Sequence, residues 1–150
     1  MSGHILLEGG AEFGEKMVEP DLRAIQLAGG LQARIGVIPT AAAPDHNDQR
    51  GGRNAVNWFT HLGAQQVELV PLGDRRSAEL PAIAEALLRC RLVYMLGGFP
   101  DYLGQTLAGS SAWKAAMQAY LAGAVVSGSS AGAMVLCQYY YDPDRPAPDL

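Results

Sequence analysis

The sequence is poor in charge and in cysteine. Of its 150 residues only 17% are charged while 49% are hydrophobic, and the formal net charge is −4. Disordered chains combine low hydrophobicity with high charge, so this composition indicates a folded chain with one buried core. An acidic chain with scattered Lys and Arg also has no electrostatic reason to bind nucleic acid or an anionic membrane surface.

The two cysteines exclude a disulfide framework. Cys90 and Cys137 lie far apart and form no CxxC pair, so we interpret each as a small buried hydrophobic residue. No apolar run approaches the roughly 20 residues that a membrane span needs. The start, MSGHILLEGG, lacks the basic region of a signal peptide. We therefore expect a cytoplasmic protein.

The order of apolar and polar segments predicts an α/β fold. Five apolar runs alternate with four helical segments, and a short helix follows the last run. This order is typical of a three-layer domain, with a doubly wound, mostly parallel sheet covered by helices on both faces. The predicted strands are HILLE, ARIGVIPT, QQVELVPL, RLVYML and AVVSG, and the helices EPDLRAIQLAGG, NAVNWFTHLG, SAELPAIAEALLRC, SSAWKAAMQAYLAG and SAGAMVLCQ.

We expect residues 1–150 to form a single domain. The segment AAAPDHNDQRGG, residues 41–52, is predicted to be a long polar loop, and Ser77 to cap the third helix. Residues 142–150 contain three prolines and are predicted to be irregular. In open α/β sheets, sites form at the carboxyl ends of the strands. Those ends are Gly9–Gly10, Pro39–Thr40, Gly97–Gly98 and Gly128–Ser130.

The stretch VVSGSSAGAMV, residues 125–135, holds three serines within four positions, and only Ser130 has glycine two positions before and after it. In this G-x-S-x-G pattern a strand turns sharply into a helix and exposes the serine at the corner. We interpret Ser130 as a nucleophile. The Ala131 N–H, the positive end of the short helix and an N–H from residues 97–99 would form an oxyanion hole. The alternative is that residues 128–132 form only a tight turn.

Five segments carry a further signal: LEGGAEF, GVIPTAAAP, HLGAQQVELVPL, VYMLGGFPDYL and GSSAGAMVL. In these segments and their order, the chain resembles the peptidase E and cyanophycinase family of serine peptidases, which is related in fold to class I glutamine amidotransferase domains. The resemblance covers nearly the whole chain and implies a flavodoxin-like sheet, a nucleophilic Ser130, an oxyanion hole at Gly98 and Ala131, and no metal or organic cofactor. It also implies hydrolysis of Asp-X dipeptides or β-aspartyl units. Phe99 stands where the family usually has Asn, a position that bears on specificity.

Histidine, the base that activates serine in this family, is scarce in this chain. The three histidines, His4, His46 and His61, all precede Ser130, whereas the family triad places its acid and its histidine after the serine. His4 opens the first strand and His61 ends a helix, so both are expected at the amino edge of the sheet. Only His46 is expected at the carboxyl edge, near the site.

Other residues are candidates by their position. His46 is either a solvated loop residue or, with Arg50, Arg53 and Phe99, part of a surface that binds a small acidic or β-aspartyl peptide. Asp142 and Asp144 are either the triad acid or turn formers beside a proline.

Three explanations account for the missing histidine. The chain is the N-terminal part of a longer domain, which we favour because the turn Gly128–Gly132 that carries Ser130, called the elbow below, is intact. Alternatively, it is a short, non-catalytic amidotransferase-like binding module, or another chain supplies the histidine. An incomplete sheet would expose an edge or an apolar face, so a homodimer is also expected.

Overall fold

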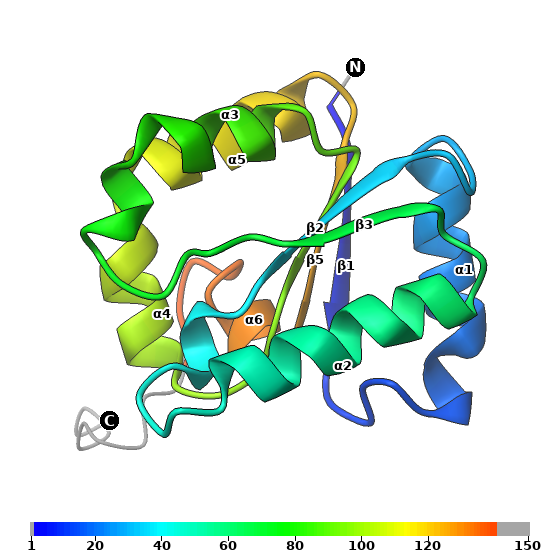
Figure 1. The fold of residues 1–150 in the computed structure, drawn as a ribbon, viewed down its shortest axis with the longest axis horizontal. Coiled ribbons are helices and arrows are strands. Elements are labelled where there is room, and N and C mark those ends of the chain that lie inside the picture. The colour runs from blue at the N-terminus through cyan, green and yellow to red at the C-terminus, as the bar shows by residue number, and fades with distance from the viewer. Residues whose placement is uncertain (1, 141–150) are drawn as a thin grey trace.

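The computed structural model describes residues 2–140 and contains one five-stranded sheet (Figure 1). All neighbouring strands are parallel, in the spatial order β1-β5-β4-β2-β3. This arrangement confirms the predicted α/β class. The strands are β1 (His4–Glu8), β2 (Arg34–Ile38), β3 (Gln66–Leu69), β4 (Leu92–Met95) and β5 (Val125–Ser129).

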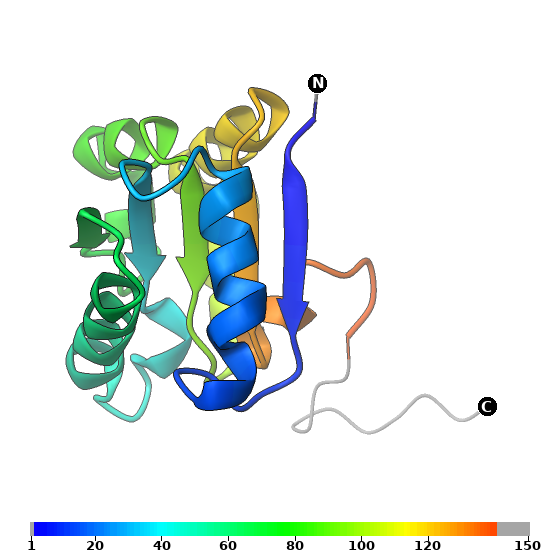
Figure 2. The same ribbon diagram turned by 90° about the vertical axis from the view of Figure 1, so that its right-hand side faces the viewer.

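Helices cover both faces of the sheet and complete the three layers (Figures 1 and 2). One face carries α1 (Val18–Leu27) and α2 (Asp48–His61). The opposite face carries α3 (Pro81–Leu88), α4 (Pro100–Leu107), α5 (Ser111–Leu121) and α6 (Ala131–Met134). Short 3₁₀ helices are η1 (Glu15–Met17), η2 (Thr40–Ala42) and η3 (Ser77–Glu79).

Two hydrophobic clusters hold the layers together, one on each face. Successive residues of a strand point to opposite faces, so β4 serves both clusters. Its Leu92 and Tyr94 pack toward α1 and α2, and its Val93 and Met95 pack toward α3, α4 and α5. Because β4 is buried on both faces, its sequence is continuously apolar, as is usual for inner strands of parallel sheets.

β1 is an edge strand, and among residues 2–140 only β5 pairs with it (Figure 2). Its Ile5 and Leu7 side chains are each 51% exposed, whereas Leu6 packs inward. The expected apolar face at an open sheet edge is therefore present. The homodimer remains a prediction.

Two local expectations were wrong. Residues 41–52 are not one polar loop, because η2 occupies Thr40–Ala42 and α2 begins at Asp48. Ser77 does not cap α3: its Oγ accepts from the N–H groups of Gly73 and Asp74, and α3 begins only at Pro81. The connection from β4 to β5 holds two helices, α4 and α5.

The two cysteines also differ from each other. Cys90 is buried, as expected, and packs against Gly36. Cys137 is exposed. It follows α6, which is shorter than predicted and ends at Met134, so Cys137 lies outside the packed face of that helix.

Candidate active site

Ser130 is the corner between β5 and α6. Its φ of 49° and ψ of −112° lie in a region that L-residues rarely occupy, and its side chain is exposed. Its N–H donates to the Glu8 carbonyl of β1, with an N–O distance of 2.9 Å. The other two serines of the motif, Ser127 and Ser129, are buried within β5. The strained, exposed serine is therefore the one that the flanking glycines predict.

The glycines around Ser130 sit where backbones almost touch. A Cβ on Gly128 would collide with the backbone of Gly132, and a Cβ on Gly132 would collide with the carbonyl of Met95 in β4. The strand and the short helix can approach this closely only because both positions lack side chains. This is the physical requirement of the G-x-S-x-G pattern.

The loop after β4 lies against the same corner, because β4 and β5 are neighbours in the sheet. A Cβ on Gly97 would lie 3.2 Å from the Ser130 Cβ. Gly98 has φ +143° and a Cβ there would collide with the Ala41 carbonyl, which also accepts the N–H of Phe99 at 2.8 Å. The Gly98 N–H donates to no acceptor within residues 2–140. As the first residue of α6, Ala131 likewise has no helical acceptor for its N–H.

The histidines lie as expected relative to the sheet. His4 begins β1, and His61 ends α2, where its ring lies 6.5 Å from that of Trp58. His46 is exposed between η2 and α2, with φ 59°. In the part of the chain that the structure describes, no hydrogen bond joins a histidine to Ser130.

The remaining candidates are spread over the carboxyl edge. Arg50 and Arg53 lie in the first turns of α2 rather than on a loop, and the Arg50 Nε donates to the Asn47 side chain at 2.8 Å. Phe99 is the residue before α4 and is 42% exposed. Asp142 and Asp144 lie outside the described residues.

Sequence reasoning missed Glu12. Its Oε1 lies 3.5 Å from the position that a Cβ on Gly97 would take, the same position that approaches the Ser130 Cβ. The Glu12 loop is held by positive φ angles at Ala11 and Phe13, and the Phe13 ring packs 6.0 Å from that of Tyr94. Within residues 2–140, Glu12 forms no hydrogen bond or ion pair. The available signal was an acidic residue two positions after Gly10, at the carboxyl end of the first strand.

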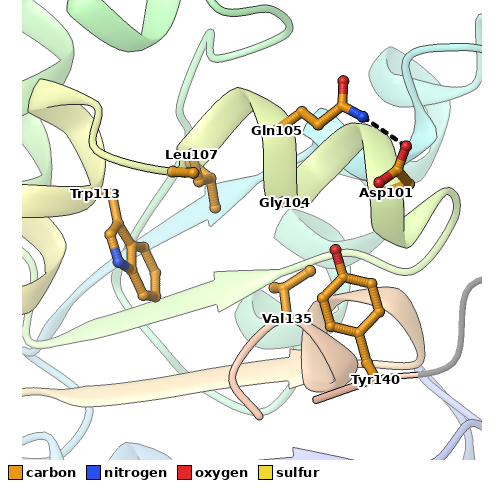
Figure 3. Close-up of a pocket in the computed structure, with 8 residues that line it drawn as sticks. Asp101, Gly104, Gln105, Leu107, Trp113, Val135 and Tyr140 are labelled. Atoms are coloured by element: carbon orange, nitrogen blue, oxygen red, sulfur yellow. Dashed lines mark hydrogen bonds between the residues drawn. The ribbon is translucent and has the colours of Figure 1, made fainter. Parts of the chain in front are cut away.

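A pocket of about 390 Å³ lies beside this corner, between α4, α5 and the segment after α6 (Figure 3). Tyr140 extends over Gly104, and Gln105 donates to Asp101 at 2.7 Å. None of its lining residues belongs to the elbow or to the Gly97–Gly98 loop, so it is distinct from the Ser130 surface.

Two further findings concern residues 2–140. None of the helices there is long and apolar enough to cross a membrane. Nor do His, Cys, Asp or Glu side chains gather there in a group of three that would hold a metal ion.

The fold and the corner at Ser130 define an α/β protein with a strained, exposed serine at a sharp strand-to-helix turn. The model of peptidase family S51 matches residues 5–145, so the chain belongs to that family of peptidases. It is 34% identical over 140 residues to a cyanophycinase of Synechococcus elongatus, covering 90% of this chain and 42% of that protein. It is 29% identical over 136 residues to a cyanophycinase of Geminocystis herdmanii, covering 88% and 48%.

Solved structures of other proteins share the fold of this chain. A peptidase from an acI-B1 Actinobacterium superposes with a TM-score of 0.83 at 28% identity, over 91% of this chain and 57% of that one. A protein named as a peptidase E from Listeria monocytogenes EGD-e shares the fold, with a TM-score of 0.68 at 23% identity, over 89% and 61%. The chain spans less than half the length of the two cyanophycinases, from Synechococcus elongatus and Geminocystis herdmanii.

Proposed function

We propose that this chain contributes the nucleophile of a serine-type peptidase that cleaves aspartyl or β-aspartyl peptide bonds. The observation that carries the proposal is the strained, exposed backbone of Ser130 at the junction of β5 and α6. Relatives named cyanophycinase and peptidase E support the substrate class.

The proposed chemistry is acyl transfer. The Ser130 Oγ attacks the scissile carbonyl and loses its proton to a base, and the carbonyl oxygen becomes an oxyanion. The N–H groups of Gly98 and Ala131 stabilise that oxyanion, together with the positive end of α6. The base is a histidine that this 150-residue sequence does not contain after Ser130, and Asp142 or Asp144 is the candidate for its acidic partner. This chemistry uses no metal or organic cofactor.

The charges around Ser130 suggest how the substrate lies. The Glu12 carboxylate would repel a substrate carboxylate placed beside the Gly97 loop. We propose that the acidic group instead extends toward Arg50 and Arg53 on α2, with His46 and Phe99 at the same edge of the sheet. The partner is then a small acidic peptide, and we propose a cytoplasmic, homodimeric protein that binds neither nucleic acid nor membrane.

The test uses the full-length protein and synthetic Asp-X and β-aspartyl dipeptides. Ser130→Ala is expected to lower kcat/KM by at least about 10³-fold, because the nucleophile is removed. Ser129→Ala removes the neighbouring buried hydroxyl and is the matched control, which should stay near wild-type activity. A serine-reactive phosphonate should form an adduct on Ser130 in the wild type. Turnover that survives Ser130→Ala contradicts the proposal.

A second candidate is a non-catalytic, amidotransferase-like binding module. One observation favours it: no histidine is hydrogen-bonded to Ser130 among residues 2–140. It predicts that the full-length protein gives no phosphonate adduct and no turnover, yet binds the dipeptides in calorimetry. An adduct on Ser130 excludes it.

A further inference from the structure

Two carboxyl groups are buried directly behind the Ser130 elbow. Glu8 ends β1 and is 2% exposed, and Asp21 lies on α1 and is 1% exposed. Among residues 2–140 neither forms an ion pair with Lys, Arg or His. Two buried carboxylates without a cation cannot both ionise cheaply, because each charge loses its hydration and repels the other.

The hydrogen bonds around Glu8 and Asp21 leave one carboxylate oxygen without a donor among residues 2–140. Glu8 accepts from the Tyr94 hydroxyl at 3.1 Å and from the Ser127 hydroxyl at 3.5 Å. The Asp21 Oδ2 accepts from the Trp58 indole N–H at 2.7 Å, while its Oδ1 is buried without a donor. A proton on Glu8, donated to Asp21, would supply the missing hydrogen bond.

The pKa shifts of Glu8 and Asp21 agree with one proton shared by the two carboxyl groups. Burial, together with the hydrogen bond to and the negative charge of the nearby Asp21, raises the pKa of Glu8 to about 8. Burial also raises the pKa of Asp21. Tyr94 on β4 is the titratable group that contacts the pair, and Glu12 on the loop after β1 interacts in turn with Tyr94; both are acids. Neither can neutralise a second negative charge.

The pair is connected to the elbow by the backbone of Glu8. The Glu8 carbonyl accepts the Ser130 N–H, and Glu8 is the register partner of Ser129 in the parallel β1–β5 ladder. An unusual backbone conformation such as that of Ser130 persists only where neighbouring contacts fix it. The end of β1 is one of those contacts.

We propose that Glu8 and Asp21 are positioning residues that share one proton and thereby hold the end of β1, and with it the Ser130 elbow, in place. This proposal rests on the proposed function for its catalytic consequence. When the shared proton is lost, the two charges repel each other, α1 and β1 separate locally, and Ser130 loses its backbone anchor.

The structural test measures hydrogen exchange of the Ser130 amide and needs no turnover. After correction for the intrinsic exchange rate, protection in the wild type should fall about 10-fold or more between pH 7 and pH 9, because the anchor opens locally. In Glu8→Gln the amide donates to Asp21 without titrating, so protection should stay constant over that range. Equal losses of protection in both proteins would overturn the proposal.

The catalytic test measures kcat and KM of the full-length protein from about pH 6 to pH 9.5. Glu8→Ala should lower kcat by roughly 10- to 100-fold while changing KM little, since it displaces the nucleophile and not the substrate contacts. Glu8→Gln should restore most of that loss and remove the alkaline decline of kcat. An alkaline decline of equal size in Glu8→Gln and wild type would refute the catalytic role. If Ser130→Ala stays active, the proposed function fails, while the exchange measurement still decides on the pair.

Discussion

The buried Glu8 carboxyl predicts a fold that loses stability as the pH rises through neutrality. Burial raises its pKa from 4.5 to about 8 in the folded protein. Between these two values the folded state keeps a proton that the unfolded chain has released, so the free energy of unfolding falls with rising pH. The contribution of Glu8 is fully present below pH 4.5, where both states are protonated, and is lost above about pH 8.

The size of this decline follows from the shift. One pH unit inside the window costs at most about 1.4 kcal/mol of stability per group. Raising the pH from about 5.5 to about 8 should therefore remove about 3 kcal/mol. For a chain of 150 residues this corresponds to a fall in Tm on the order of 10 °C.

The assay is urea unfolding followed by far-UV circular dichroism at the two pH values. Glu8→Gln cannot titrate, so the stability difference between it and the wild type should change by about 3 kcal/mol between them. Glu79→Gln is the control, because the Glu79 carboxylate is exposed and hydrogen bonds from Ser111 lower its pKa. That variant should keep the wild-type decline. Parallel pH dependences of wild type and Glu8→Gln would show that Glu8 is ionised in the folded state, and would refute the reasoning.

Two further predictions concern the elbow and the thiols. Ser130→Gly should raise the free energy of unfolding by about 1 kcal/mol, because glycine adopts positive φ without strain, whereas Ser130→Ala keeps the strain and should gain nothing. Thermal unfolding of the two variants compares them, and equal stabilities would contradict the strain. A thiol reagent should modify only Cys137 in the native protein, since burial raises the pKa of Cys90 to about 12. Peptide mapping identifies the site, and native modification of Cys90 would be the contrary result.

The sequence predicted the sheet well because its inner strands are buried on both faces. The sequence LVYM of β4 is apolar at every position, and such a run predicts a buried strand without knowledge of its tertiary contacts. The sequence did not predict the start of α2, because residues 48–52 have the composition of a turn. Those glycines are kept in the helix by packing: a Cβ on Gly52 would collide with Leu69 of β3. That contact depends on tertiary structure, which overrides the low helix propensity of glycine.

The residues of the candidate site also differ in whether the sequence alone could predict them. The elbow could be predicted because its steric requirement is local: Gly128 and Gly132 flank Ser130 within five residues. The Glu8–Asp21 pair could not, because a carboxylate read alone is expected at the surface. Its burial depends on β1 pairing with β5, which joins Glu8 to Ser129 across most of the chain.

The sheet order explains why the end of β1 matters to the elbow. Ser130 is held from both neighbours of β5: the Glu8 carbonyl on β1 accepts its N–H, and the Met95 carbonyl of β4 packs against Gly132. β4 is an inner strand, buried on both faces, so its side of the corner is rigid. β1 is an edge strand with one partner strand among the described residues and two half-exposed apolar side chains. The weaker support of the elbow is therefore β1, and the buried carboxyl pair lies where that strand most needs an additional contact to α1.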